Sequence, residues 1–338
     1  MRMEGADIRN VVFTVLYGMT ILLSAVGNTI LIYIVWKRPE VRSLNSFMFV
    51  NMAVADLLVT LFIMTWSIAQ FYNRGTWLIT GMLGEITCRG FPYFGYINLA
   101  ASILCLVIMA IDRYYAVLQP LNRHILWFRK AKVITPLIWF MAMLLASIIC
   151  VFHDQVDGKL CQYNFEVFGE DLRETLRPFY YFYIFTIIYF IPLVIISVLY
   201  GIVAYKVWFH QTPGFHLTES QQRQELTKRR VLRMLIVIVV TFAACWLPSQ
   251  VFNLLFAFRI EPSGNIMFYI FFLAYWCSHA NSAINPWLYL GLSSKMNLAL
   301  KNMVSKIRRT KPEIQGQRTT RNTRNIAIKN QKEQTTHL

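Results

Sequence analysis

Seven segments of this chain are apolar and long enough to cross a lipid bilayer. A helix rises about 1.5 Å per residue, so about 20 apolar residues cross a hydrocarbon core about 30 Å thick. With 56% hydrophobic and 15% charged residues, the chain is too apolar for a soluble protein of 338 residues. The sequence therefore predicts an all-α membrane protein, a bundle of seven transmembrane helices. The segments are Val11–Trp36, Leu44–Phe71, Phe91–Leu118, Val133–Phe152, Phe179–Trp208, Met234–Phe258 and Ile266–Leu290.

The distribution of Lys and Arg predicts the orientation of this bundle. With the N-terminus outside, 24 of these residues fall on the cytoplasmic side and eight on the outer side. Positive residues concentrate on the cytoplasmic side of membrane proteins, so we expect an extracellular N-terminus in a multi-pass protein of the plasma membrane. The net charge of +16 then reflects topology and attraction to the anionic inner leaflet of the bilayer, and we expect no nucleic acid as a partner.

The chain divides into four predicted parts. After the last span, apolar residues recur at spacings of three and four between lysines, which is typical of an amphipathic helix on the inner membrane face. The polar second half of Phe209–Lys228 is predicted to extend the sixth helix into the cytoplasm. The parts are an extracellular tail (1–10), the seven-helix bundle (11–292), a short amphipathic eighth helix (293–309) and a disordered basic tail (310–338).

Two cysteines, Cys88 and Cys161, lie outside the predicted spans on the oxidising side. Two such thiols favour one disulfide. It would join the outer end of the third helix to the loop after the fourth.

Ionisable residues are sparse at mid-depth, where we find one carboxylate, Asp56, and one histidine, His279. A proton pump needs a relay of several titratable groups, and an intramembrane aspartyl protease needs two facing aspartates. There is no HExxH motif for a metalloprotease, and the seventh span has no lysine for a retinal Schiff base. We therefore expect neither an enzyme nor a transporter, although a seven-helix transporter is the alternative from another class.

Asp56 needs polar partners, and neighbouring spans offer them at similar depth. Oxygen ligands around one carboxylate suit a small cation such as Na⁺. A water-filled hydrogen-bond network without an ion explains the same residues equally well. The candidate partners are Asn28, Asn98, Ser102, Asn281, Ser282 and Asn285.

Asp112 and Arg113 form a pair of opposite charges at the cytoplasmic end of the third span. An arginine at this edge can be held by its neighbour in one arrangement and released to other acceptors in another, as in a switch. The alternative is an interfacial anchor that does not move.

Motifs in all seven spans resemble the rhodopsin-like (class A) G-protein-coupled receptors. Each motif alone is weak evidence, but seven in order, one per helix, are specific. They are Gly27–Asn28, "NMAVADL" at Asn51–Leu57, "DRY" at Asp112–Tyr114, Trp139, Pro192 with Tyr200, "CWLP" at Cys245–Pro248 and "NPWLY" at Asn285–Tyr289.

This resemblance implies a role for each matching residue. A sodium ion in the resting state would be held by Asp56, Asn98, Ser102, Trp246, Asn281, Ser282 and Asn285. A core connector would consist of Ile103, Pro192, Phe242, Trp246 and Pro248, and an inner switch of Asp112, Arg113, Tyr200 and Tyr289. The implied partners are a heterotrimeric G protein, engaged by an outward swing of the sixth helix, and arrestin. A receptor or scaffold without G-protein coupling is a further alternative, which the intact motifs disfavour.

The chain departs from this family's pattern at several positions. Lys228 stands where some relatives place a carboxylate opposite the switch arginine, so the resting lock should depend on Asp112 alone. The second span has no proline to kink it. Met296 replaces an expected aromatic residue in the eighth helix.

The ligand is predicted to be a peptide, with a lipid or another non-amine small molecule as the alternative. Amine receptors of the family carry an aspartate where this chain has Gly95. The outer loop has an acidic excess that would attract a cationic ligand, and it resembles receptors of the neuropeptide Y, tachykinin and orexin kind. His279 is more often a packed ring than a contact, and Trp66 and Trp77 are interpreted as membrane-belt or loop-packing residues. The predicted wall consists of Phe91, Gly95, Tyr96, Leu99, Tyr163, Gln250, Asn253 and His279.

Overall fold

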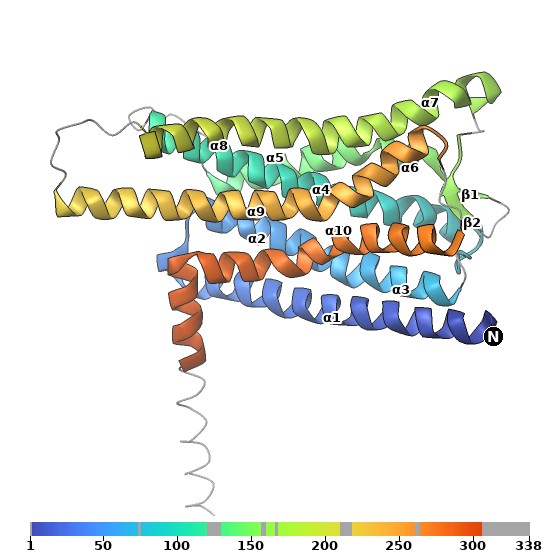
Figure 1. The fold of residues 1–338 in the computed structure, drawn as a ribbon, viewed down its shortest axis with the longest axis horizontal. Helices are drawn as coiled ribbons and strands as arrows, with labels where there is room; N and C mark the ends of the chain where they lie inside the picture. The colour runs from blue at the N-terminus through green and yellow to red at the C-terminus, as the bar shows by residue number, and fades with distance from the viewer. Residues whose placement is uncertain are drawn as a thin grey trace, which may run out of the picture.

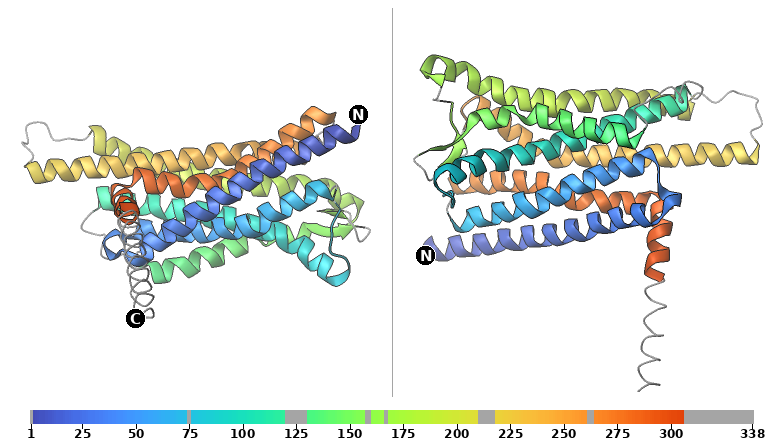
Figure 2. Two further views of the ribbon diagram at one scale, coloured as in Figure 1. Left: turned by 90° about the horizontal axis from the view of Figure 1, so that it is seen from below. Right: turned by 180° about the vertical axis from the view of Figure 1, so that it is seen from behind.

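The computed structural model describes residues 2–73, 76–119, 130–156, 160–165, 168–209, 218–260 and 264–305. Its helices run alongside one another in an elongated bundle, and a two-stranded hairpin lies at the end where the N-terminus is found (Figure 1, Figure 2). The elements are α1 (Arg2–Lys37), η1 (Pro39–Val41), α2 (Leu44–Leu58), η2 (Val59–Met64), α3 (Thr65–Tyr72), α4 (Gly81–Leu118), α5 (Ala131–Ala146), α6 (Ile148–Phe152), β1 (His153–Val156), β2 (Leu160–Tyr163), α7 (Glu170–Tyr183), η6 (Ile184–Phe190), α8 (Ile191–Phe209), α9 (Glu219–Ala257) and α10 (Gly264–Leu292).

The seven predicted spans coincide with seven helical rods in the described part of the chain. The second rod is α2–η2–α3, the fourth is α5–α6, the fifth is α7–η6–α8, and the other four are single helices. Within the described residues, six rods are long and apolar enough to cross a membrane by length and composition alone. The seventh, α10, carries polar residues such as His279, Asn281 and Asn285 among its apolar ones. The all-α bundle is therefore confirmed.

Several helices begin earlier than the apolar pattern predicts. α4 begins at Gly81 and α7 at Glu170, about nine residues outside their apolar runs. α9 begins at Glu219, where Thr218 and Gln221 form a capping box, so the predicted helical extension of the sixth span is confirmed, while its cytoplasmic position stays a prediction. α1 begins at Arg2, so most of the predicted tail 1–10 is helical.

Two spans contain a π-helical stretch, η2 in the second and η6 in the fifth. A π stretch inserts an extra residue into a turn and changes the direction in which the following side chains point. η6 ends two residues before Pro192, whose ring nitrogen cannot donate the regular helical hydrogen bond. In the second span, which has no proline, η2 supplies the irregularity.

β1 and β2 pair antiparallel at the end of the bundle where the N-terminus lies, in the register His153 opposite Tyr163 (Figure 1). A disulfide joins Cys161 of β2 to Cys88 of α4, which confirms the predicted pairing. The hairpin is thereby fixed across the mouth of the bundle.

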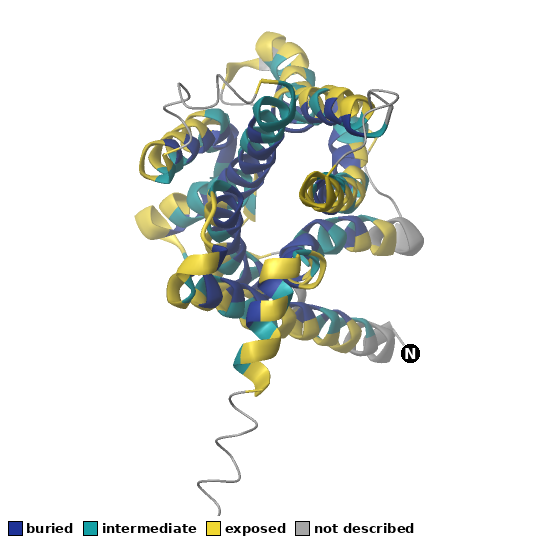
Figure 3. Cartoon of the chain, turned by 90° about the vertical axis from the view of Figure 1, so that its left-hand side faces the viewer, coloured by how far each residue is buried: buried dark blue, intermediate teal, exposed yellow. Residues whose placement is uncertain are grey.

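Viewed along its axis, the bundle buries the inward-facing side of each helix and exposes the outward-facing side (Figure 3). The exposed side carries large apolar residues, such as Leu22 and Leu61, each 63% exposed. This distribution suits a protein surrounded by lipid tails.

Residues 294–305 form a further helix, which turns steeply away from α10 (Figure 1). Its predicted position on the inner membrane face stays a prediction. The predicted disordered tail 310–338 lies outside the described residues.

Candidate functional site

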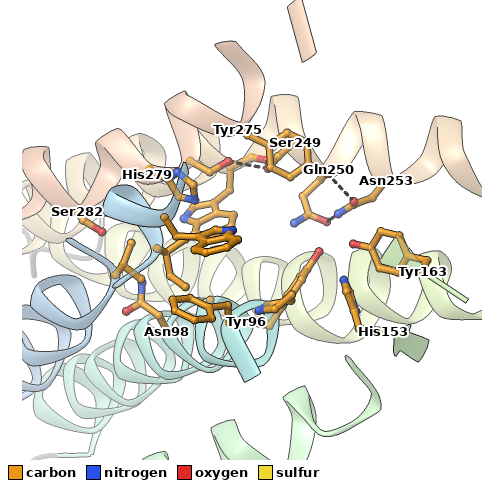
Figure 4. A pocket seen from close by; sticks show the side chains of 18 of the residues that line it. Tyr96, Asn98, His153, Tyr163, Ser249, Gln250, Asn253, Tyr275, His279 and Ser282 are labelled. Carbon is orange, nitrogen blue, oxygen red and sulfur yellow. Dashed lines mark hydrogen bonds between the residues drawn. The ribbon is translucent and has the colours of Figure 1, made fainter. Parts of the chain in front are cut away.

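A cavity of about 250 Å³ lies at the hairpin end of the bundle, enclosed by the second span, α4, the hairpin, α9 and α10 (Figure 4). Seven of the eight residues predicted for the ligand wall line it. They are Phe91, Gly95, Tyr96, Tyr163, Gln250, Asn253 and His279.

Leu99 is the exception, and its prediction as a wall residue is wrong. Its side chain is fully buried within the main hydrophobic core. The neighbouring Asn98 lines the cavity instead. Consecutive residues of a helix point about 100° apart, since a turn takes about 3.6 residues, and here Asn98 points to the cavity while Leu99 points into the core.

Trp66 and Trp77 also line the cavity, and Trp77, which is 5% exposed and donates to the Thr87 hydroxyl at 3.1 Å, packs at the hairpin end as the loop-packing interpretation expects. Their ring centroids are 4.1 Å apart, and the ring of Trp66 lies 5.2 Å from that of Phe91. That these two rings line the cavity could not be predicted from the sequence, because Trp77 lies on a connection whose path depends on the folded hairpin end.

The cavity wall contributed by α9 and α10 is polar but uncharged. Asn253 donates to Gln250 at 3.3 Å and accepts from the Tyr275 hydroxyl at 3.4 Å. Ser278 donates to Ser249 at 2.7 Å. No Asp, Glu, Lys or Arg is found among the described residues that line the cavity.

Two histidines complete the lining. His279 lies 2.9 Å from the Tyr17 hydroxyl, so it is a packed, hydrogen-bonded ring that also faces the cavity. His153, at the start of β1, contacts the Ile149 carbonyl at 3.1 Å. Burial lowers the pKa of His153 to about 4, so this ring is neutral at physiological pH.

The outer loop's carboxylates are partly neutralised where the structure describes them. Asp154 lies 3.4 Å from Arg89, and Glu174 pairs with Arg259. Asp157 and Glu166 fall outside the described residues, so the predicted acidic mouth stays a prediction.

Asp56 is buried in the middle of the bundle, where α10 supplies its hydrogen-bond donors. Ser282 donates to one carboxylate oxygen at 2.7 Å, and Asn285 to the other at 3.5 Å. Asn28, a candidate partner, instead donates to Ser24 and to the Ser282 carbonyl. The Asp56 side chain therefore does not face lipid, since it is 1% exposed.

Several oxygens of the predicted sodium set are buried without a hydrogen-bond partner. The described structure leaves unpartnered Asn98 Oδ1, Ser102 Oγ, Asn281 Oδ1 and Asn285 Oδ1. A buried polar atom without a partner is costly, so such atoms mark a place where a cation or water belongs. One carboxylate with neutral oxygens fits a small monovalent cation. Because Asn98, Trp246 and Ser282 also line the cavity, its floor reaches this polar cluster.

At the opposite end of the bundle, Arg113 is held by two acceptors. Its Nη2 donates to Asp112 Oδ2 at 2.7 Å and to Asn45 Oδ1 at 3.3 Å. Lys228 pairs with Glu225 on its own helix at 2.7 Å. Asn45 was not expected from the sequence, and it adds a second acceptor to the predicted lock.

The two predicted switch tyrosines lie near this pair. Tyr289 contacts the Ser46 hydroxyl at 3.0 Å and stacks on Phe49 with centroids 3.8 Å apart. The Tyr200 hydroxyl is buried without a hydrogen-bond partner in the described structure. Arg113 and Tyr289 both line a cavity of about 460 Å³ at this end of the bundle.

The predicted core connector lies between the two ends. Ile103 and Phe242 are buried in the main core, and the Phe242 and Trp246 centroids are 6.2 Å apart. The structure adds Tyr189, whose hydroxyl donates to the Ala243 carbonyl at 2.8 Å, five residues before Pro248 of α9.

Residues 27–289 match the family described as "7 transmembrane receptor (rhodopsin family)". The chain belongs to the rhodopsin family of seven-transmembrane receptors. It is a multi-pass membrane receptor, which confirms the resemblance seen in its motifs and the prediction that it is not an enzyme, and which excludes the transporter alternative.

Three related rhodopsin-family receptors show where this chain stands. It is 28% identical to the QRFP-like peptide receptor of Branchiostoma floridae, over 91% of this chain and 80% of that receptor. It is 30% identical to the somatostatin receptor type 5 of Bos taurus, over 88% of this chain and 77% of that receptor. It is 28% identical to the substance-P receptor of Rattus norvegicus, over 86% of this chain and 70% of that receptor.

Proposed function

We propose that this receptor is activated by an extracellular peptide and promotes nucleotide exchange on a heterotrimeric G protein, with arrestin as a further partner. Its place is the plasma membrane, with the N-terminus outside. The observation that carries the proposal is the uncharged, amide-rich and aromatic cavity beneath a disulfide-fixed hairpin, at the end opposite Arg113. The named relatives are receptors for peptides, which supports the ligand class.

The cavity chemistry favours a peptide end over an amine. The primary amides of Gln250 and Asn253 offer both donors and acceptors, which suit the backbone amide groups of a peptide. A cationic amine would need a carboxylate, and none is found among the described lining residues. At about 250 Å³ the cavity admits only a terminal residue or two, so the rest of the peptide lies over the hairpin.

A screen of amidated peptides on cells expressing the receptor, monitored by both calcium and cyclic AMP, tests this function. Asn253→Ala should lower the potency of an active peptide, because the substitution removes one amide from the cavity wall. Asn73→Ala, at the outer end of α3 and not among the cavity-lining residues, is the matched control. Activation by lipids but not by any peptide would contradict the proposed ligand class.

We also propose that the resting receptor holds a sodium ion at Asp56, with oxygens from Asn98, Ser102, Asn281, Ser282 and Asn285 and with Trp246 closing the site. The four unpartnered oxygens and the buried carboxylate support this proposal. The ion would supply positive charge to a buried carboxylate. The test compares the thermal stability of the purified receptor in sodium and in potassium: sodium should stabilise the wild type but not Asp56→Asn. Equal stability in the two salts would contradict the site and favour a water network.

A further inference from the structure

A larger cavity than the two described above lies at the inner end of the bundle, between α9 and the chain that follows α10. Its volume is about 990 Å³. Its lining is strongly cationic, and no acidic residue is found among the lining residues that the structure describes. We call it the basic cleft; its cations are Arg229, Arg230, Arg233 and Lys301.

One wall of the basic cleft follows a single face of α9. Leu226, Arg230, Arg233 and Val237 recur at spacings of four and three, which places them on one side of the helix. The same face continues with Val240, which is 60% exposed on the outside of the bundle. Exposed apolar residues of a spanning helix contact lipid tails. The two arginines therefore lie where the lipid-facing side of α9 meets the headgroups.

The other wall comes from the end of α10 and the helix 294–305. Leu292 and Leu298 are 40% and 61% exposed, and Lys301 follows one turn later. Arg230 donates to Ser294 Oγ at 2.9 Å, a bond that spans the basic cleft and places the guanidinium between the walls. A guanidinium has five N–H donors, so this bond leaves others for a further acceptor.

We propose that the basic cleft binds the phosphorylated headgroup of an anionic phospholipid from the inner leaflet. Guanidinium groups suit phosphate because they form paired, charge-assisted hydrogen bonds. The exposed Val237, Leu292 and Leu298 provide an apolar surface for the acyl chains. A soluble phosphate would meet the same cations but would gain nothing from this surface, so the lipid is the preferred occupant.

The experiment measures binding of a phosphatidylinositol bisphosphate to the receptor in phosphatidylcholine nanodiscs, by native mass spectrometry or with a fluorescent lipid. Arg233→Gln and Lys301→Gln, one from each wall, should each weaken binding about five-fold, the usual effect of one basic residue near an anionic surface. Lys206→Gln is the matched control, because it removes an exposed charge from the last turn of α8, outside the described lining of the basic cleft. Thermal unfolding of each variant verifies folding.

A second arm separates the lipid from its headgroup. Leu298→Gln should weaken binding of the lipid but leave binding of the soluble inositol phosphate unchanged. Equal losses in Lys206→Gln and the two cleft variants would overturn the proposal in favour of general surface attraction. Unchanged binding in all charge variants, or a soluble headgroup bound as tightly as the lipid, would overturn it as well.

Discussion

The two acceptors of Arg113 predict how an amide at the start of α2 controls basal signalling. Asn45 is buried, and its Oδ1 accepts from Arg113 at 3.3 Å, while Asp112 accepts from the same nitrogen at 2.7 Å. Asn45→Ala removes the longer bond and leaves Asp112 as the acceptor. The resting arrangement should be weakened, so nucleotide exchange without ligand should rise.

The geometry sets the size of this effect. A hydrogen bond to a charged group contributes about 1.5–3 kcal/mol. The bond between Arg113 and Asn45 is longer than the usual charge-assisted bond of about 2.7–2.9 Å. The Arg113 side chain is also 24% exposed, so water competes for it. We therefore assign about 1 kcal/mol to the bond, which corresponds to about a five-fold rise in basal exchange.

The assay is the rate at which a G protein takes up a GTP analogue in the presence of purified, ligand-free receptor in nanodiscs. Asn45→Asp is the matched variant, because it places a carboxylate where the amide oxygen lies and should hold Arg113 more firmly. Its basal rate should fall below that of the wild type.

Two outcomes would refute this reasoning. Equal basal rates in the wild type and both variants would show that Asn45 does not restrain Arg113. A rise in both variants would show that the substitutions act by disturbing the first turn of α2, whatever the charge of the new side chain.

Two further predictions concern stability. A Cβ on Gly27 would lie 2.8 Å from Pro286 Cγ, so Gly27→Ala should cost about 1–3 kcal/mol and lower the unfolding temperature, whereas Gly18→Ala, with nothing within 4 Å, should not. Burial lowers the pKa of His153 from 6.5 to about 4, so its neutral form favours the folded state. Thermal stability should therefore be constant above pH 6.5, fall as the pH drops towards 4, and fall less in His153→Phe. A drop as steep in that variant would assign the pH dependence to other groups.

The sequence predicted the spans and the polar cluster around Asp56 because exposing polar or charged groups to lipid has a high free-energy cost. A charge such as Asp56 is expensive in lipid, so its presence in an apolar run already indicated polar neighbours. The observed donors, Ser282 and Asn285, were among the predicted ones. The disulfide was predicted in a similar way, because two cysteines on the outer side lie outside the predicted spans.

Features that depend on how segments meet could not be predicted. Trp77 reaches the cavity through a connection whose path is fixed only in the folded bundle, and Leu99 turns into the core because of the helix's rotation. The π-helical stretch η2 contains no proline that would have indicated it in the sequence. Asn45 lies far from Arg113 in the chain, so their contact follows from how α2 and α4 pack together.

The hydrogen bond from the Tyr189 hydroxyl to the Ala243 carbonyl links the fifth and sixth spans. It lies five residues before Pro248, whose ring nitrogen cannot donate the regular helical hydrogen bond of α9. An outward movement of the inner half of α9 therefore breaks this hydrogen bond unless the fifth span moves with it. Breaking this neutral hydrogen bond, which contributes about 0.5–1.5 kcal/mol, is therefore part of the cost of separating the two spans.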